Sequence, residues 1–596
     1  MRTAFIAALL VPMLALAAAD RCPVTVVPDE HVPVLASEPV TASGSGPNVV
    51  ETDFLVGTVD TIGGTTYDWQ ANGPVYRMMA NAPGNGVHVT WMFSASMTGT
   101  AFADRNMKYN YYDFTLAGWQ YNDPDFMASG INVFSDRTGY GSLDYDPADM
   151  VAVISGHQGT TVLHPVVARD MLPGAGIFDL CAGDALANLW PPIALDQNSK
   201  VHCACIIDDG SANRKNLYYT NVDPWCTWMT PISIVGPQPN PEFSDQNIAA
   251  SKQSGKVCVT WVYSPTGYNQ DPGFYRISND GGTTWGDATD LGWPPAFGGD
   301  TTPSYHITSL FPFYDRADRL HIMAGVTPFY NDTNWILPAQ IWHWCPDLSP
   351  QWSMVHEAYA DSIGAAVGYN ASLACRPSIG EDSQGNLFVA WEEFDPVNVE
   401  PGPPTVLRGD IFVAGSDDDG MSWHDAVKLT EGGTGSHRFP SVIDMAVDMA
   451  GEAEEVWIVY EIDQVAGFFV QSENIATNNP IIVHKVPVSD IIPSGVAEPG
   501  VSRAPLANEL TATPNPLGGR TVIGYALARP GAMTLTVYDA AGRPVRVLDQ
   551  GVRDAGRYRV AWDRRSDGGE LVAAGVYFYT LATDDKSLTE KLIVVR

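Results

Sequence analysis

One pattern recurs along most of this 596-residue chain and restricts the fold more than any other feature. It is clearest in Cys375–Glu393, where a short strand reaches a turn, Asp382–Asn386, and a second strand with alternating apolar residues follows. Strong β runs of this second kind return at intervals of roughly 50–70 residues, as in repeat folds. The seven runs are His88–Phe93, Met150–Ser155, Lys200–Ile207, Lys256–Tyr263, Arg319–Val326, Asn386–Glu393 and Glu455–Glu461.

Each run lies within a larger unit of about four strands. A turn-rich patch precedes every run, another short strand usually precedes the patch, as in Pro440–Ile443, and more β-like sequence follows, as in Gly409–Ala414. Units of this kind, which bury their faces against neighbouring units, are typical of a β-propeller. The chain is therefore predicted to be all-β, with a propeller over residues 49–488 that has seven blades, or six as the alternative.

The amino terminus has the pattern of a secretory signal peptide over residues 1–19. Arg2 supplies a positive charge, Ala4–Leu16 is apolar, and three alanines precede Asp20. Residues 20–48 are rich in Pro, Val, Ser and Gly and are interpreted as an extended segment. No later stretch is apolar over the ~20 residues that a transmembrane helix needs. We therefore expect a secreted or cell-surface protein without a transmembrane segment.

The charge balance, the cysteines and the histidines limit the possible partners and cofactors. A formal net charge of −35 disfavours nucleic acid and anionic membrane surfaces as partners. The eight cysteines are irregularly spaced, so they predict no disulfide scaffold and leave the pairing open. His88, His202 and His321 each lie early in a strong run, where we expect a structural polar contact. No spacing is typical of a zinc site, so we expect neither a metal nor another cofactor.

Two segments share the pattern S-x-D-x-G-x-x-W. In such a turn the Asp carboxylate accepts backbone N–H groups, Gly allows a positive φ, and Trp packs beneath. The pattern resembles the Asp-boxes of sialidase-like (BNR-repeat) propellers, where it lies away from the active centre. The resemblance implies a structural role for the matching residues, which are Ser278, Asp280, Gly282 and Trp285 in one segment and Ser416, Asp418, Gly420 and Trp423 in the other.

The composition changes after the predicted propeller. Residues 489–508 contain the Pro-, Gly- and Ser-rich stretch Ile491–Pro505 and are interpreted as a linker. In Glu509–Arg596 basic and acidic residues are nearly balanced, whereas the preceding chain is strongly acidic, which indicates a separate domain. Six alternating segments predict a small Ig-like β-sandwich over residues 509–596.

This terminal domain resembles the FlgD-like Ig modules and the type A sorting domains of type IX secretion cargo. The matching residues include Pro514, Asn515, Pro516, Gly542, Trp562, Gly575, Tyr577 and Lys591. The resemblance implies a module that an outer-membrane export machinery recognises, or an accessory Ig module. A plain β-sandwich spacer is the alternative.

The sialidase-like resemblance also raises the question of glycosidase chemistry. In that family three arginines bind a carboxylate, a Tyr/Glu pair supplies the nucleophile and an Asp acts as acid/base. Arg77, Arg376 and Arg438 occupy comparable early-strand positions in three repeats, so they are the candidate catalytic residues. The family's Arg-Ile-Pro signature is absent from these positions, and no Tyr–Glu pair or acid Asp is identified. The alternative is that the arginines pair with carboxylates between blades.

Three functions follow as hypotheses. We favour a non-catalytic protein whose propeller binds a glycan or an extracellular protein. Aromatic clusters within Tyr109–Tyr121 and Tyr330–Trp344 can stack on sugars, although core packing between blades accounts for them equally well. The alternatives are an exo-glycosidase of the sialidase type and an architectural component of a cell surface or an adhesion.

Overall fold

The computed structural model describes residues 52–595 with gaps. The gaps are residues 72, 99–101, 160–162, 184–187, 208–215, 236–242, 264–271, 296–304, 331–332, 361, 403–404, 449–452, 494–508, 514, 516, 518–520, 528–530, 554–555 and 584–585. The predicted signal peptide 1–19, the segment 20–48 and most of the predicted linker 489–508 lie outside the described residues. The chain divides into two compact units, 1–294 with 304–493 and 494–596 with 295–303, and each is described by itself.

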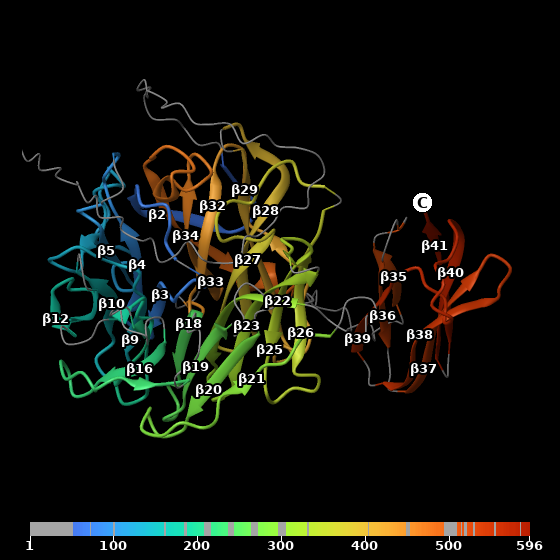
Figure 1. The fold of residues 1–596 in the computed structure, drawn as a ribbon, viewed down its shortest axis with the longest axis horizontal. Helices are drawn as coiled ribbons and strands as arrows, with labels where there is room; N and C mark the ends of the chain where they lie inside the picture. Colours follow the sequence, from blue (N-terminus) through green and yellow to red (C-terminus); the bar gives the residue numbers. More distant parts are fainter. Residues whose placement is uncertain are drawn as a thin grey trace, which may run out of the picture. The chain divides into compact units, whose positions relative to one another are not determined.

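The first unit is a ring of seven antiparallel sheets, or blades, coloured from blue to orange in Figure 1. The prediction of an all-β propeller with seven blades is therefore confirmed in the described part of the chain. The first four blades, from the innermost strand outward, are β3 (Met79–Ala82), β4 (Gly86–Phe93), β5 (Asn106–Asp113) and β6 (Gly118–Trp119); β9 (Leu143–Asp146), β10 (Val151–Gln158), β11 (His164–Asp170) and β12 (Phe178–Ala182); β14 (Ile193–Leu195), β15 (Val201–Ile207), β16 (Leu217–Val222) and β17 (Ile232–Ser233); and β18 (Phe243–Ala250), β19 (Val257–Tyr263), β20 (Gly273–Ser278) and β21 (Thr289–Asp290).

The remaining three blades complete the ring. They are β22 (Tyr305–Tyr314), β23 (Leu320–Tyr330), β25 (Ala339–Trp344) and β26 (Trp352–Ala358); β27 (Ala374–Glu381), β28 (Leu387–Glu400), β29 (Val406–Ser416) and β30 (Val427–Lys428); and β32 (Ser436–Val442), β33 (Glu455–Asp463), β34 (Asn479–Pro487) and β2 (Thr58–Thr65). Short additional elements are β1 (Thr52–Phe54), β7 (Ile131–Asn132), β8 (Thr138–Gly139), β13 (Asn188–Leu189), β24 (Thr333–Asn334), β31 (Thr430–Gly432), the 3-10 turn η2 (Phe469–Gln471) and α1 (Val488–Ile491).

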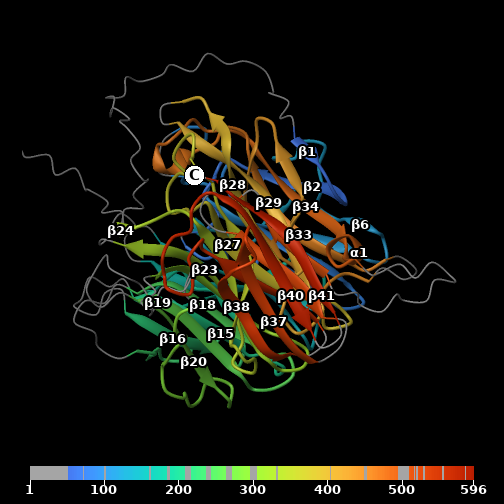
Figure 2. The same cartoon turned by 90° about the vertical axis from the view of Figure 1, so that its right-hand side faces the viewer.

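The seventh blade joins the two ends of the propeller sequence. Its outermost strand, β2, comes from the start of the described chain and pairs antiparallel with β34 near the end of the propeller. Figure 2 shows β2, β34 and β33 side by side. The inner ends also meet, because the backbone N–H of Met78 donates to Ser441 Oγ at 3.0 Å. The ring is therefore closed by hydrogen bonds between segments that lie 363 residues apart at the inner ends and more than 400 residues apart in the β2–β34 pair.

The seven strong β runs of the sequence form the second strand of each blade. In β19 all seven residues are buried, because both faces of a blade pack against neighbouring blades. This explains why these runs are apolar on both faces and stand out in the sequence. The first strands are shorter or more polar, and several contain β-bulges. Register shifts occur at Ser244–Asn247, Cys375–Ser378 and Arg438–Ser441.

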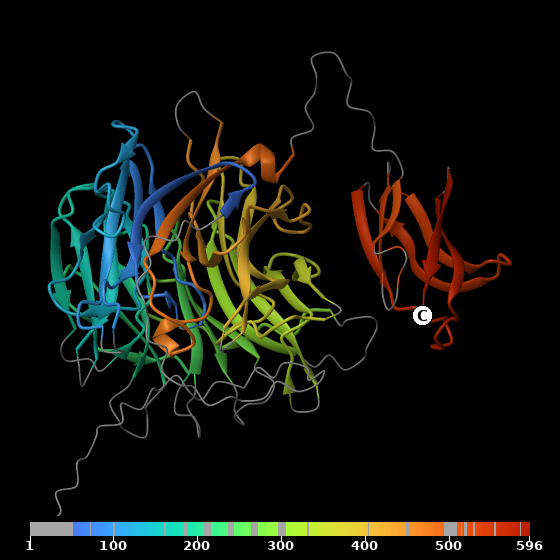
Figure 3. The same ribbon diagram turned by 90° about the horizontal axis from the view of Figure 1, so that it is seen from above.

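The second unit is a two-sheet sandwich, drawn in red in Figure 3. One sheet is β35 (Glu509–Thr513), β36 (Thr521–Leu527) and β39 (Gly556–Trp562), and the other is β38 (Pro544–Arg553), β37 (Gly531–Asp539), β40 (Gly575–Thr583) and β41 (Ser587–Val594). The predicted Ig-like sandwich is confirmed. The first strand, β35, was not among the six predicted segments.

Most residues of the sorting-domain pattern have a structural role in this sandwich. The Asn515 side chain bridges to the last strand, donating to the Lys591 carbonyl at 2.7 Å and accepting the Ile593 N–H at 2.9 Å. Trp562 is fully buried and Tyr577 donates to the Ala573 carbonyl at 2.8 Å. These contacts hold the ends of the module together.

Two glycines of the same pattern mark strand boundaries. Gly542 has a φ of +78° in the turn between β37 and β38, which only glycine adopts without strain. Gly575 is the first residue of β40. Pro514 and Pro516 lie outside the described residues.

The cysteines are divided between one disulfide and buried thiols. Cys181 in β12 and Cys226 after β16 form a disulfide that links the second and third blades. The other described cysteines, Cys203, Cys205, Cys258, Cys345 and Cys375, are free and buried. None of the helices in the described part of the chain has the length and apolar character needed to cross a bilayer.

Candidate functional site in the central channel

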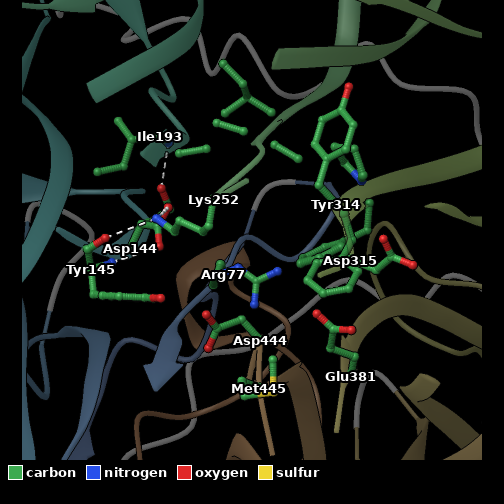
Figure 4. A pocket seen from close by; sticks show the side chains of 18 of the residues that line it. Arg77, Asp144, Tyr145, Ile193, Lys252, Tyr314, Asp315, Glu381, Asp444 and Met445 are labelled. Atoms are coloured by element: carbon green, nitrogen blue, oxygen red, sulfur yellow. Dashed lines mark hydrogen bonds and ion pairs between the residues drawn. The ribbon is translucent and has the colours of Figure 1, made fainter. Parts of the chain in front are cut away.

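A cavity of about 230 Å³ lies in the central channel of the ring. Its walls come from the first strands of the blades, or from residues beside them. Most lining residues lie in the second half of a first strand or in the turn that follows, as Lys252, Asp315 and Glu381 do. We call the end of the ring that carries these turns the turn face, and the opposite end the loop face. The cavity, seen in Figure 4, occupies the half of the channel next to the turn face.

The cavity reaches solvent at the turn face. Pro83 and Gln253 line it, are exposed, and lie in the turns between the first and second strands of blades 1 and 4. The side chain of Arg316, in the corresponding turn of blade 5, is 46% exposed. A ligand therefore has access to the cavity from the turn face.

Aromatic side chains near the loop face pack together in the core. Trp69 stacks on Phe468 with ring centroids 5.8 Å apart, and Phe439 packs on the same ring at 5.8 Å. Phe102 packs on Tyr67 at 4.8 Å. All five rings belong to one buried cluster, which we call the aromatic plug.

Two of the three candidate arginines meet on one buried carboxylate. Arg376 and Arg438 both form ion pairs with Glu392 of β28, and the distance from Arg438 Nε to Glu392 Oε2 is 3.3 Å. The three side chains are at most 2% exposed. Burial raises the pKa of Glu392, but the two guanidiniums outweigh burial and hold this pKa at about 2. The two arginines thus neutralise a carboxylate of the protein itself.

Bulges explain why these two arginines point away from the cavity. Arg376 has a φ of +57° within the bulge of β27, and Phe439, next to Arg438, has a φ of +59° within the bulge of β32. A bulge changes the direction of the side chains around it. The alternation expected of a regular first strand is therefore lost at the two positions.

Arg77 has a different environment and lines the cavity. Its guanidinium carbon is 5.6 Å and 5.5 Å from the ring centroids of Phe311 and Phe313. Its Nη1 is buried and has no hydrogen-bond partner among the described residues. Figure 4 shows the guanidinium in the centre of the cavity with no dashed line reaching it. The structure brings Arg376 and Arg438 together on Glu392 but does not bring Arg77 to the same carboxylate.

Carboxylates around the cavity connect neighbouring blades. Asp144 of blade 2 accepts the backbone N–H of Leu195 in blade 3 at 2.7 Å and Lys252 Nζ of blade 4 at 2.9 Å. Asp444, which follows the first strand of blade 7, accepts the backbone N–H of Asn81 in blade 1 at 2.8 Å. Burial raises the pKa of Asp444, while the charge of the cavity arginine lowers it. These carboxylates therefore contribute to holding the ring together.

Two further carboxyl groups of the cavity have opposite pKa shifts. Burial, reinforced by the nearby charge of Asp315, raises the pKa of Glu381 to about 8. One of its oxygens accepts the backbone N–H of Arg316 at 2.8 Å. Burial also raises the pKa of Asp315, but hydrogen bonds from His321 and Arg319 outweigh it and hold this pKa at about 2. At neutral pH, Glu381 is therefore mostly protonated and Asp315 is ionised.

Sequence reasoning did not identify Glu392, Lys252 or the cavity carboxyl groups. Asp144, Glu381 and Asp444 lie near the ends of first strands, where the sequence is rich in acidic turn residues. Their position at the end of the innermost strand of three repeats was the available signal. These acidic residues can be recognised from the sequence only after the end of each first strand has been distinguished from the turn that follows it.

The first Asp-box is the turn between the third and fourth strands of blade 4. The backbone N–H groups of Gly282 and Thr284 donate to Ser278 Oγ and Asp280 Oδ1, each at 2.8 Å. Hydrogen bonds from the Thr284 hydroxyl and from its backbone N–H hold the pKa of the Asp280 carboxyl low, at about 2. The Trp285 indole donates to the Gly282 carbonyl at 3.2 Å. The box does not line the cavity.

The second Asp-box repeats this geometry in blade 6. The N–H of Gly420 donates to Ser416 Oγ at 2.9 Å, and Ser416 Oγ donates to Asp418 Oδ1 at 2.9 Å. Gly420 has a φ of +83° and lies against the ring of His343 in blade 5, so a Cβ at this position would overlap that ring. Trp423 is mostly buried beneath the turn. The box therefore packs one blade onto the next.

The repeated histidines and the aromatic clusters are also part of the ring. Each histidine bonds through Nδ1 to a third-strand side chain of its own blade. The pairs are His88 with Tyr109, His202 with Tyr219, and His321 with His343, at 2.7, 2.7 and 2.8 Å. In the aromatic clusters, Tyr109, Tyr111, Trp342 and Trp344 are buried in the core. They do not form an exposed platform for sugars.

Comparison with known proteins gives a family match for the terminal module. The FlgD Ig-like domain family matches residues 515–587, so the chain carries a FlgD Ig-like domain. A search of curated proteins finds no match for this chain. The match to FlgD covers only the terminal module and says nothing about the propeller.

Solved structures similar to the chain include several that act on polysaccharides or glycans. An ulvan lyase of polysaccharide lyase family 25 has 12% identity and a TM-score of 0.43, with 71% of this chain and 96% of the lyase covered. An α-L-arabinanase from Penicillium chrysogenum has 10% identity and a TM-score of 0.36, with coverage of 73% and 98%. The Hadza microbial sialidase Hz136 has 11% identity and a TM-score of 0.32, with coverage of 66% and 75%. Likeness at this level assigns no activity to this chain.

Proposed function

We propose that this chain is an extracellular, non-catalytic glycan-binding protein whose ligand occupies the channel cavity. The observation that carries the proposal is the composition of the cavity wall. Aromatic rings, including those of Phe311 and Tyr145, lie beside a guanidinium, an ammonium group and a protonated carboxyl group. Sugars present apolar ring faces and a rim of hydroxyl groups, so they suit a wall of this mixed kind.

The size of the cavity limits how much of a glycan it accepts. Typical ligand pockets have volumes of roughly 300–1,000 Å³, and this cavity has about 230 Å³. It therefore suits one sugar ring or the end of a chain. The rest of a longer glycan would extend over the turn face, past Gln253 and Arg316.

A glycan array tests the proposal with one variant at the mouth of the cavity and one matched control. In Gln253→Trp an indole stands at the mouth, and Gln384→Trp places the same group in the equivalent turn of blade 6, away from the cavity lining. We expect the full chain and Gln384→Trp to bind the same glycans and Gln253→Trp to lose them. Equal binding by all three proteins, or no binding by the unmodified chain, contradicts the proposal.

A sialidase-type hydrolase is the alternative, and the site gives it less support. Arg376 and Arg438 are paired with the buried Glu392, so they are not available to bind a substrate carboxylate. Incubation of the full chain with fluorogenic sialosides and other fluorogenic glycosides decides between the two. Turnover that exceeds that of a heat-denatured control would replace the binding proposal with the hydrolase. Without turnover, an architectural role is separated from binding by the glycan array.

The terminal module is proposed to serve export or surface attachment. Its support is the FlgD Ig-like match together with the sorting-type pattern that ends in the strand containing Lys591. In a host with type IX secretion, we expect the full chain outside the cell and a chain lacking residues 509–596 in the periplasm. The same location for both proteins would make the module an accessory domain.

A further inference from the structure

A cluster of buried carboxyl groups lies where the closing strand meets the rest of the seventh blade. Glu461 and Asp463 are two residues apart in β33, so their side chains lie on the same face of that strand. Asp68 comes just after the closing strand β2, and its charge acts on both of them. The three residues are at most 3% exposed. We call them the carboxyl cluster.

Two oxygen atoms of the cluster are buried without a donor in the described part of the chain. Glu461 accepts the side-chain amide of Asn479 at 2.7 Å through Oε1, but its Oε2 has no partner within these residues. Asp463 accepts the backbone N–H of Val465 at 3.3 Å through Oδ1, and its Oδ2 likewise lacks a partner there. A buried carboxylate is strongly disfavoured unless a charge or donors compensate it. Burial, reinforced by the nearby charge of Asp68, therefore raises the pKa of Glu461 and Asp463 well above the usual range.

Asp68 attaches the segment that follows the closing strand to the loop between β33 and β34. We call that loop, residues 464–478, the closing loop, and it contains η2. The Asp68 carboxyl accepts the backbone N–H of Phe469, and that of Val470 at 3.2 Å. The adjacent rings of Trp69 and Phe468 stack on each other. The carboxyl group and the aromatic plug therefore hold the same two segments together.

Charged groups on the neighbouring elements leave the cluster without a counter-ion of its own in the described part of the chain. Arg438 of β32 lowers the pKa of Asp68, but its guanidinium is already paired with Glu392. Two further carboxyl groups lie nearby. They are Glu400 at the end of β28, which is paired with Arg408 of β29 at 2.8 Å, and Glu473 of the closing loop, which accepts the backbone N–H of Phe468 at 3.0 Å.

Ionisation of the cluster opposes the attachment of the closing loop. Burial raises the pKa of Asp68 to about 7, although the two backbone N–H groups and Arg438 lower it. Because the folded pKa lies above the ordinary value, the protonated group stabilises the closed arrangement in acid, and this stabilisation is lost as the pH rises through 7. In the ionised cluster, charges without counter-ions lie close together in the protein interior. Separation of the two segments brings these charges into contact with water, which solvates them.

We propose that the closing loop is a pH-sensitive latch, which is closed while the carboxyl cluster is protonated and detaches from the segment after β2 when the cluster is ionised. Opening separates Trp69 from Phe468 and uncovers part of the aromatic plug. The seven blades stay paired, because the ladder between Thr58–Thr65 and β34 is formed by other, backbone groups. The latch is independent of the glycan-binding function proposed above, since none of its residues lines the channel cavity.

Hydrogen exchange followed by mass spectrometry on the full chain tests the latch. The measured quantity is the protection factor, which corrects for the intrinsic dependence of exchange on pH, in peptides that cover residues 66–71 and 464–478. A pKa of about 7 for Asp68 alone predicts that protection in the closing loop falls about tenfold between pH 6 and pH 9. Protection in the second strands of the blades, such as β19, should stay the same. Equal protection of the closing loop at both pH values would overturn the inference, as would an equal loss of protection in every blade.

Two variants separate the cluster from other effects of pH. Asp68→Asn still accepts a backbone N–H from η2 but cannot ionise, so its closing loop should keep most of its protection at pH 9. Glu431→Gln removes an exposed carboxylate outside the cluster and should behave like the unmodified chain. The same fall in Asp68→Asn as in the unmodified chain would overturn the role of the cluster. The pH series of the unmodified chain decides the question on its own if Asp68→Asn does not fold.

Discussion

The buried pairing of Glu392 with Arg376 and Arg438 gives the sharpest stability prediction. Glu392→Gln keeps the size of the side chain but removes its charge, which leaves two guanidiniums without a counter-ion at positions that are at most 2% exposed. Breaking a buried ion pair by removing one partner typically lowers the free energy of unfolding by about 3–5 kcal/mol. We expect a loss of this size.

The pKa of Glu392 gives an independent value for the same quantity. Its pKa is about 2 in the folded protein and 4.5 for the unperturbed group. Because the folded pKa is lower, the carboxylate stabilises the fold above pH 4.5, and this stabilisation is lost as the pH falls toward 2. A difference of about 2.5 pKa units corresponds to roughly 3 kcal/mol. The two values agree within the accuracy of either.

Thermal unfolding at neutral pH is the assay. A ring of roughly 440 residues that unfolds as one unit has an unfolding entropy of about 0.9 kcal/mol/K. A loss of about 3–5 kcal/mol therefore lowers the Tm by about 3–5 °C. The control is Glu431→Gln, whose side chain is 60% exposed and, among the described residues, paired only with Lys428, so its Tm should change by less than about 1 °C. Equal Tm values for the two variants would refute the buried-pair reasoning.

Three further predictions concern other parts of the ring. Burial raises the pKa of Asp68 to about 7, so its protonated form stabilises the fold in acid, and that stabilisation is lost as the pH rises toward and through 7. The Tm values measured at pH 5.5 and pH 8.5 should therefore differ less in Asp68→Asn than in the unmodified chain. Gly420→Ala should lower the unfolding free energy by at least about 2 kcal/mol, and Gly385→Ala by only about 1 kcal/mol, because both glycines have a positive φ but only Gly420 lacks space for a Cβ. Equal losses of the two variants in denaturant melts would contradict the Asp-box packing. Replacing Cys181 and Cys226 by Ser opens a loop of 45 residues and should lower the unfolding free energy, measured by urea titration, by up to about 4 kcal/mol. Unchanged stability would show that the fold does not need this disulfide.

The propeller could be predicted because its second strands are buried on both faces. Lys256–Tyr263 and the other strong runs are apolar without alternation, and each follows a turn patch, so the repeat is visible without any structure. The closing strand, β2, was not predicted. Thr58–Thr65 has little apolar character, and its partner β34 lies more than 400 residues away. Two strands that lie so far apart in the sequence show no pattern in either segment that would predict their pairing.

The site was less predictable than the fold, for a physical reason. The three arginines occupy similar sequence positions, yet bulges in β27 and β32 turn Arg376 and Arg438 onto Glu392, while Arg77 remains in the cavity. Bulge positions depend on how a strand meets its neighbours, which a single sequence does not encode in an obvious way. The Asp-boxes were easier to interpret, because every bond of that turn is local.

The most direct test of the account is a crystal structure of the full chain with the tightest-binding glycan from the array. The account predicts a sugar ring in the channel cavity, reached from the turn face past Gln253. A glycan bound at the loop face or on the outer strands, with the cavity free of ligand, would contradict the central claim.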